Sequence, residues 1–115
     1  MSTLFASVAV TDYQVACRWY ARLLGRPPDM IPNEIEAAWR FSHTAWIYII
    51  VDAHRAGNGL ITVIIENLDQ HVAALGERGF VPDDIEDVPG GYRRAYFRDP
   101  DGNRIGFAQV FTPEG

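Results

Sequence analysis

Apolar residues in the first quarter of the chain follow two different periodicities. Residues 3–10 (TLFASVAV) are β-branched and apolar, which is typical of a strand. Thr11 and Asp12 then supply a helix N-cap, and Gly25 with the prolines at 27–28 marks the end of that helix. Between these signals the apolar positions recur at helical spacing: Val15, Ala16, Trp19, Tyr20 and Leu23. The pattern predicts a strand followed by an amphipathic helix.

Short strands are predicted after this helix, at about 29–32, 36–42 and 45–51. The segment 52–59 (DAHRAGNG) contains turn-forming residues, and the same order of elements begins again after it. The first half of the chain therefore predicts the order βαβββ.

The second half repeats that order at a displacement of roughly 55 residues. Residues 60–65 form an apolar strand, and Asn67 or Asp69 can cap a helix that ends before Gly79. The apolar face of this helix consists of Leu68, Val72 and Leu75. Further strands are predicted near 83–88, 91–98 and 104–110.

The fold predicted from this pattern is α+β, with two tandem βαβββ modules that form curved mixed sheets around a cleft and one helix on the outer face of each. We expect one domain over residues 1–115, with module 1 at about 3–52, a linker at about 53–59 and module 2 at about 60–111. Alternation along the strands predicts the residues of the inner faces: Phe5, Ser7, Trp46, Tyr48, Leu60, Thr62, Gly106 and Ala108.

Composition narrows the functional classes. The 115 residues are 48% hydrophobic and 22% charged, as expected for a globular protein, and the longest apolar run, 45–51, is far shorter than the roughly 20 residues that cross a bilayer. A net charge of −5 argues against nucleic acid and favours a cationic ligand. Arg93, Arg94 and Arg98 are interpreted as a solvated strand face. One cysteine, Cys17, and no secretory signal predict a cytoplasmic protein.

Two stretches carry a family resemblance: VAVTDYQVACRWYARLLG at 8–25 and FRDPDGNRIGF at 97–107. They resemble the vicinal oxygen chelate superfamily, which contains glyoxalases, bleomycin resistance proteins and extradiol dioxygenases. The resemblance implies a homodimer with clefts at or near its interface. It also implies four metal-ligand positions, which in this sequence match Phe5, Tyr48, Leu60 and Gly106.

None of these four residues is a good ligand for a divalent metal, which prefers imidazole, carboxylate or thiolate. Gln109 is a weak candidate without a visible partner, and His43, His54 and His71 lack the spacing of metal ligands. No nucleophile motif of the Gly-x-Ser-x-Gly kind occurs, and Cys17 lies within a helical pattern. We therefore predict no metal and no cofactor.

Aromatic residues are the remaining candidates for a site. The predicted ligand-binding residues are Phe5, Trp39, Trp46, Tyr48, Leu60 and Tyr92, although an aromatic residue on a strand can equally belong to the core. The leading hypothesis is a metal-independent protein, similar to bleomycin-resistance-type members, that binds a small, partly aromatic molecule. The alternatives are a lyase, isomerase or dioxygenase with an atypical metal site, and a metal-free enzyme with Tyr48, Glu36 or Glu66 as general base.

Overall fold

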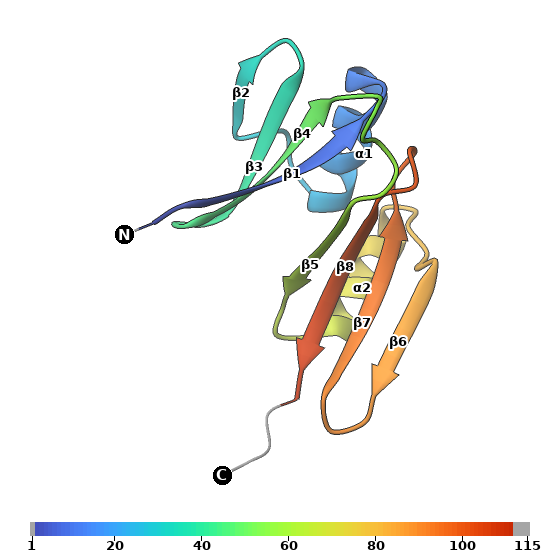
Figure 1. Cartoon of the computed structure of the whole chain (residues 1–115). Coiled ribbons are helices and arrows are strands. Elements are labelled where there is room, and N and C mark those ends of the chain that lie inside the picture. Colours follow the sequence, from blue (N-terminus) through green and yellow to red (C-terminus); the bar gives the residue numbers. More distant parts are fainter. Residues whose placement is uncertain (1, 112–115) are drawn as a thin grey trace. The chain divides into compact units, whose positions relative to one another are not determined.

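The computed structural model describes residues 2–111 and contains two βαβββ modules in tandem (Figure 1). This confirms the α+β fold predicted from the sequence. The first module consists of β1 (Leu4–Val10), α1 (Tyr13–Leu24), β2 (Met30–Asn33), β3 (Glu36–Ser42) and β4 (Ala45–Val51). The second consists of β5 (Leu60–Ile64), α2 (Leu68–Glu77), β6 (Asp84–Val88), β7 (Tyr92–Arg98) and β8 (Arg104–Val110).

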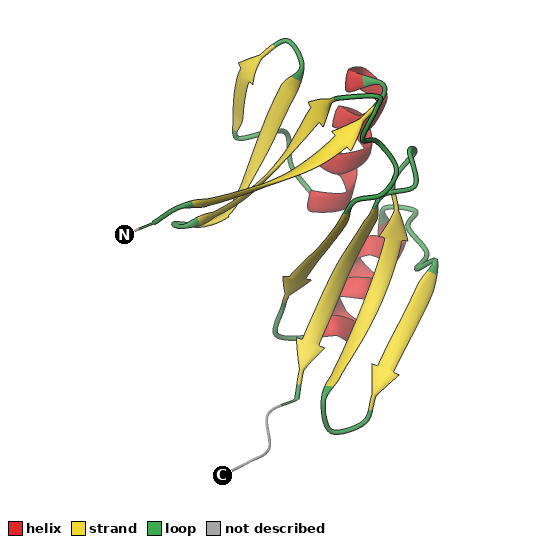
Figure 2. Ribbon diagram, viewed as in Figure 1, coloured by secondary structure: helices red, strands yellow, loops and turns green. Residues whose placement is uncertain are grey.

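The two sheets have the same topology. The strand orders are β1-β4-β3-β2 and β5-β8-β7-β6, and in each sheet the first strand pairs in parallel with the last while the other pairs are antiparallel. Each sheet is therefore mixed and open, and β1 and β5 are edge strands. Figure 2 shows one helix against one face of each sheet.

The first module is organised around α1. Asp12 caps the helix by accepting a hydrogen bond from the Val15 amide at 3.0 Å, and Gly25 ends it with a left-handed φ of 80°. Tyr20 and Leu23 on the apolar face of α1 are fully buried. Burial of a Leu side chain stabilises a fold by about 1.5–3 kcal/mol, so this face fixes the helix to its sheet.

In the second module, α2 begins after Asn67, whose side chain accepts from the Gln70 amide at 3.0 Å. Leu68 and Leu75 are buried on the helix. The sheet side of this core contains Phe97 and Phe107, whose rings meet edge to face at 6.1 Å between centroids. Of the two predicted caps, Asn67 is therefore the one that is used.

The turn Asp99–Asn103 connects β7 to β8, yet its contacts assign it to the unit that contains the chain up to Gly59. Leu60–Arg98 and the residues from Arg104 onward form the other unit.

Asp99 is buried and organises the turn by accepting from the amides of Asp101 and Asn103, each at 2.9 Å. The hydroxyl of Tyr20 donates to the other Asp99 oxygen at 2.7 Å. Burial, and then the Asp99 carboxylate, raise the pKa of Tyr20, so this hydroxyl stays protonated as a donor.

Asn103 is fully buried and bonds to backbone groups that are far away in the sequence. Its side-chain nitrogen Nδ2 donates to the Ala9 carbonyl at 2.8 Å, and its side-chain oxygen Oδ1 accepts from the backbone amides of Gly57 and Gly59 at 3.1 and 2.7 Å. The Asp101 carboxylate also accepts from the Thr11 hydroxyl at 2.7 Å. The turn is thus a tertiary element as well as a local one.

None of the helices within residues 2–111 is long and apolar enough to span a membrane.

Candidate functional site

The face of the first sheet that is opposite α1 carries a cluster of aromatic side chains. In the register of β1 and β4, Phe5 pairs with Trp46 and Ser7 pairs with Tyr48, so these residues share one face as the alternation predicted. The rings of Phe5 and Trp46 are stacked, with centroids 5.3 Å apart and planes 14° from parallel. Tyr48 meets Phe5 edge to face at 6.2 Å. We call Phe5, Trp46 and Tyr48 the aromatic cluster.

The aromatic cluster is accessible to a ligand. Phe5 is 44% exposed, and Trp46 and Tyr48 are half-buried. Arg40 pairs with Trp46 in the sheet register, and its guanidinium carbon lies 5.9 Å from the centre of the indole ring. Hydrogen bonds to the Ser42 carbonyl and to Nδ1 of His43, both at 3.0 Å, hold this guanidinium in place. The cluster therefore offers flat rings with a cation beside them.

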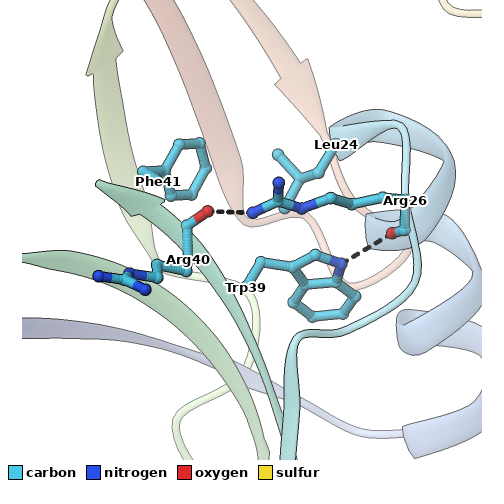
Figure 3. Close-up of a pocket in the computed structure, with 5 residues that line it drawn as sticks. All are labelled: Leu24, Arg26, Trp39, Arg40 and Phe41. Atoms are coloured by element: carbon cyan, nitrogen blue, oxygen red, sulfur yellow. Dashed lines mark hydrogen bonds between the residues drawn. The ribbon is translucent and has the colours of Figure 1, made fainter. Parts of the chain in front are cut away.

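Trp39 lies apart from the aromatic cluster, on the face of the sheet that packs against α1. Its side chain is 1% exposed, its ring centroid is 6.0 Å from that of Tyr20, and its Nε1 donates to the Arg26 carbonyl at 2.9 Å. One edge of the ring lines a hollow of about 180 Å³ (Figure 3). The other residues that line this hollow are Leu24, Arg26, Arg40 and Phe41. Figure 3 shows the Arg26 side chain reaching the Arg40 carbonyl, while the Arg40 side chain points away.

The open face of the second sheet, opposite α2, carries the other predicted ligand-binding residues. Leu60 is 49% exposed at the edge strand, and Tyr92 is half-buried at the start of β7. The Tyr92 hydroxyl donates to Glu86 at 2.7 Å. This bond, together with one from Arg94, lowers the pKa of Glu86, and the same carboxylate raises the pKa of Tyr92. Glu86 is therefore ionised and Tyr92 protonated near neutral pH.

Arg94 on this face is a residue that the sequence interpretation missed. Arg93 points to the α2 side and pairs with Asp69 at 3.0 Å, whereas Arg94 lies on the open face. The guanidinium of Arg94 donates to Glu86 at 2.8 Å and to the Thr62 hydroxyl at 3.2 Å. Its side chain is only 23% exposed, so the interpretation of Arg93, Arg94 and Arg98 as a solvated strand face is wrong for Arg94. Alternation along β7, which places Arg94 between two tyrosines, is the signal that could have identified it.

The four positions that correspond to metal ligands in the resemblance do not fit a divalent metal. Phe5 and Leu60 carry no metal-binding side chain, Tyr48 is a poor ligand for a divalent metal, and the space above Gly106 is filled. A Cβ at Gly106 would lie 3.1 Å from Cδ of Arg94 and 3.3 Å from Cε1 of Tyr96. Within residues 2–111 no group of three or more His, Cys, Asp or Glu side chains is arranged to hold a metal ion.

Gln109, the weak candidate ligand, has a structural role on the other face of the second sheet. Its side-chain oxygen accepts a hydrogen bond from the Leu68 amide at 2.9 Å, at the start of α2. His71, on the same helix, contacts the Phe107 ring at 4.3 Å between centroids. His43 lies next to β4 and His54 in the linker, both exposed. Cys17 is half-buried on α1, and burial raises the pKa of its thiol, which disfavours a nucleophilic thiolate.

Comparison with known proteins agrees with the fold and with the sequence resemblance. The family described as Glyoxalase/Bleomycin resistance protein/Dioxygenase superfamily matches residues 4–107. The chain therefore belongs to this superfamily. No curated protein matches it.

Among solved structures, a glyoxalase/bleomycin resistance protein from Catenulispora acidiphila DSM 44928 is 37% identical, with a TM-score of 0.90 over 96% of this chain and 99% of that one. TnmS3, an antibiotic-binding protein from Streptomyces sp. CB03234, is 24% identical, with a TM-score of 0.74 over 96% of each chain. A lactoylglutathione lyase from Agrobacterium tumefaciens is 14% identical, with a TM-score of 0.76 over 94% of this chain and 92% of that one. At these identities the last two show a shared fold only.

Proposed function

We propose that this protein binds a small, partly aromatic molecule without the help of a metal, as a bleomycin-resistance-type member of its superfamily. The observation that carries the proposal is the exposed aromatic cluster on the open face of the first sheet. A phenyl ring that is 44% exposed on a strand contributes little to the core of its own module, and it can bind a flat ligand by stacking.

The chemistry of the cluster fits reversible capture. An aromatic pair contributes about 0.5–1.5 kcal/mol beyond the area that it buries, so contacts with the rings of Phe5 and Trp46 give useful affinity without a covalent step. The Tyr48 hydroxyl and the Arg40 guanidinium can orient polar groups of the ligand. The preference for a cationic ligand rested on the net charge of the whole chain, and the arginine beside the cluster does not support it.

The residue types also support metal independence, because the four positions that correspond to metal ligands carry Phe, Tyr, Leu and Gly. TnmS3 is described as an antibiotic-binding protein, which makes an antibiotic a reasonable ligand class for a relative of the same fold. The alternative is a metal-free enzyme with Tyr48, Glu36 or Glu66 as general base, and a binding experiment can detect it. Turnover of a bound ligand would identify it.

The test is a titration that follows tryptophan fluorescence, with bleomycin and a panel of flat aromatic antibiotics, in the presence of a metal chelator. We expect saturable binding with one ligand per site, recovery of the ligand unchanged, and a loss of affinity of about tenfold in Phe5→Ala. Phe41→Ala is the matched control, because Phe41 is a similarly exposed strand phenylalanine, 40% against 44%, outside the aromatic cluster. Equal binding by the two variants, or binding that the chelator abolishes, would refute the proposal.

We further propose that the protein is a cytoplasmic homodimer. Apolar side chains that are exposed on the edge strands support a second copy as the partner, among them Leu4 (67% exposed), Leu60 (49%) and Ile64 (62%). A ligand site close to this interface would include the aromatic cluster, since Phe5 lies on the same edge strand as Leu4. Native mass spectrometry at micromolar concentration tests this assignment, and a monomer mass would contradict it.

A further inference from the structure

The Arg94 side chain is held rigidly on the open face of the second sheet. Two of the five N–H groups of its guanidinium donate to the Glu86 carboxylate and the Thr62 hydroxyl. The rings of Tyr92 and Tyr96 lie 5.4 and 4.7 Å from the guanidinium carbon. Contacts from several strands therefore fix the direction of this cation before any ligand arrives, which lowers the entropic cost of binding.

A second guanidinium lies over the same tyrosine ring. The guanidinium carbon of Arg104 is 5.2 Å from the centroid of Tyr96, close to the 4.7 Å of Arg94. Tyr96 belongs to the open face but is only 5% exposed. The two arginines thus cover the ring, and a molecule that approaches the sheet here meets guanidinium groups before it meets the tyrosine.

The charges of the group formed by Arg94, Arg104 and Glu86 do not cancel. Glu86 is the carboxylate that pairs with Arg94, at 2.8 Å. Among residues 2–111 no carboxylate forms an ion pair with Arg104. In addition, Nε of Arg94 is buried and has no hydrogen-bond acceptor among the described residues. The group therefore has one excess positive charge.

The group also packs closely against the last strand of its sheet. The stem of Arg94 and the ring of Tyr96 fill the space above Gly106, which matches the ligand position on the last strand. A guanidinium binds the oxygens of a carboxylate or phosphate with paired hydrogen bonds.

We infer that Arg94 and Arg104 form a binding site for an oxyanion, either a carboxylate or a phosphate. This inference goes beyond the proposed function and is independent of it, because both arginines lie on the second sheet.

The experiment follows the arginine Nε–Hε signals by nuclear magnetic resonance while inorganic phosphate or acetate is added, with chloride as the control at equal ionic strength. The buried Nε–H of Arg94 gives a signal that is protected from solvent exchange, and its absence in Arg94→Lys assigns it. We expect phosphate or acetate, and not chloride, to shift the Arg94 and Arg104 signals in a saturable way. The anion that binds more tightly identifies the source of the oxyanion.

Arg104→Gln is the decisive variant, because Arg104 is exposed and its loss leaves the bonds of Arg94 intact. We expect it to weaken anion binding by about tenfold, the value of one charge-assisted hydrogen bond. Arg55→Gln removes the same charge from a side chain that is 84% exposed in the linker, and it should leave binding unchanged.

Equal effects of the two variants, or equal shifts with chloride, would overturn the inference. Because phosphate and acetate have no aromatic ring, saturable anion binding can be observed even if Phe5→Ala shows that the aromatic cluster binds nothing. That pair of results would refute the proposed function and leave the oxyanion site standing.

Discussion

Asn103→Ala is the substitution for which the structure gives the sharpest stability prediction. The side chain of Asn103 makes four hydrogen bonds: to the Ala9 carbonyl, to Asp99, and from the amides of Gly57 and Gly59, at 2.7–3.1 Å. Alanine removes all four and leaves each partner without this bond. A neutral hydrogen bond contributes about 1 kcal/mol, and a buried group that loses its partner costs about 1–3 kcal/mol.

We expect a loss of about 3 kcal/mol in the free energy of unfolding, less than the full sum because water can reach the half-buried glycine amides. Urea unfolding followed by circular dichroism measures this value. Asn58→Ala is the matched control, because Asn58 is an exposed asparagine in the same linker, and a surface change of this kind alters stability by less than about 0.5 kcal/mol. If Asn103→Ala cost less than about 1 kcal/mol, the assignment of the turn to the first unit's core would be wrong.

Two further predictions concern a backbone position and a pH dependence. Gly57→Ala should destabilise by about 1–3 kcal/mol, because φ is +99° and the new Cβ would lie 2.8 Å from the Asp101 carbonyl oxygen. Gly76→Ala in the last turn of α2, where the new Cβ would meet nothing within 4 Å, should stabilise by about 0.5–1 kcal/mol, and thermal melts of both variants check the opposite signs. Burial, and then the charge of Arg78, lower the pKa of His71 in the folded protein from the ordinary value of 6.5. As the pH drops, the unfolded state therefore binds a proton at a higher pH than the folded state does. The free energy of unfolding should consequently fall as the pH drops below about 6.5. Unfolding midpoints at pH 8 and pH 5.5 should differ more for the native protein than for His71→Gln, and equal differences would refute this pH dependence.

Most of the fold could be predicted because its local signals are strong. The caps Asp12 and Asn67, the left-handed Gly25, and the alternation of β1 and β4 each act over a few residues and agree with the structure. The predicted strand 36–42 is β3. Element boundaries agree within one or two residues because turn residues mark them on both sides.

The candidate site was less accessible to sequence reasoning, because it depends on which face of a strand a residue occupies. Trp39 was predicted beside the ligand, but the register pairs it with Ile47 on the α1 side. Arg94 was read with its neighbours as a charged surface, although its partners Glu86 and Thr62 come from two other strands. Alternation along β7 could have placed Arg94 on the open face, but the partners that it binds are distant in sequence and no local pattern reveals them.

The binding role of the remaining predicted residues stays a prediction. Phe5, Trp46 and Tyr48 come together on one face, whereas Leu60 and Tyr92 lie on the second sheet. The absence of a metal and the homodimer also stay predictions, and so do the boundaries of the single domain. The experiments described above test the binding role, the absence of a metal and the homodimer.

The turn Asp99–Asn103 has a consequence for how such a chain can be divided or can evolve. A fragment that ends at Gly59 would contain a complete βαβββ sequence, but the Tyr20 hydroxyl and the Ala9 carbonyl would lose partners that lie 79 and 94 residues downstream. The two repeats are therefore not interchangeable copies. A single repeat of this design would need another molecule to supply the hydrogen bonds that Asp99 and Asn103 make here.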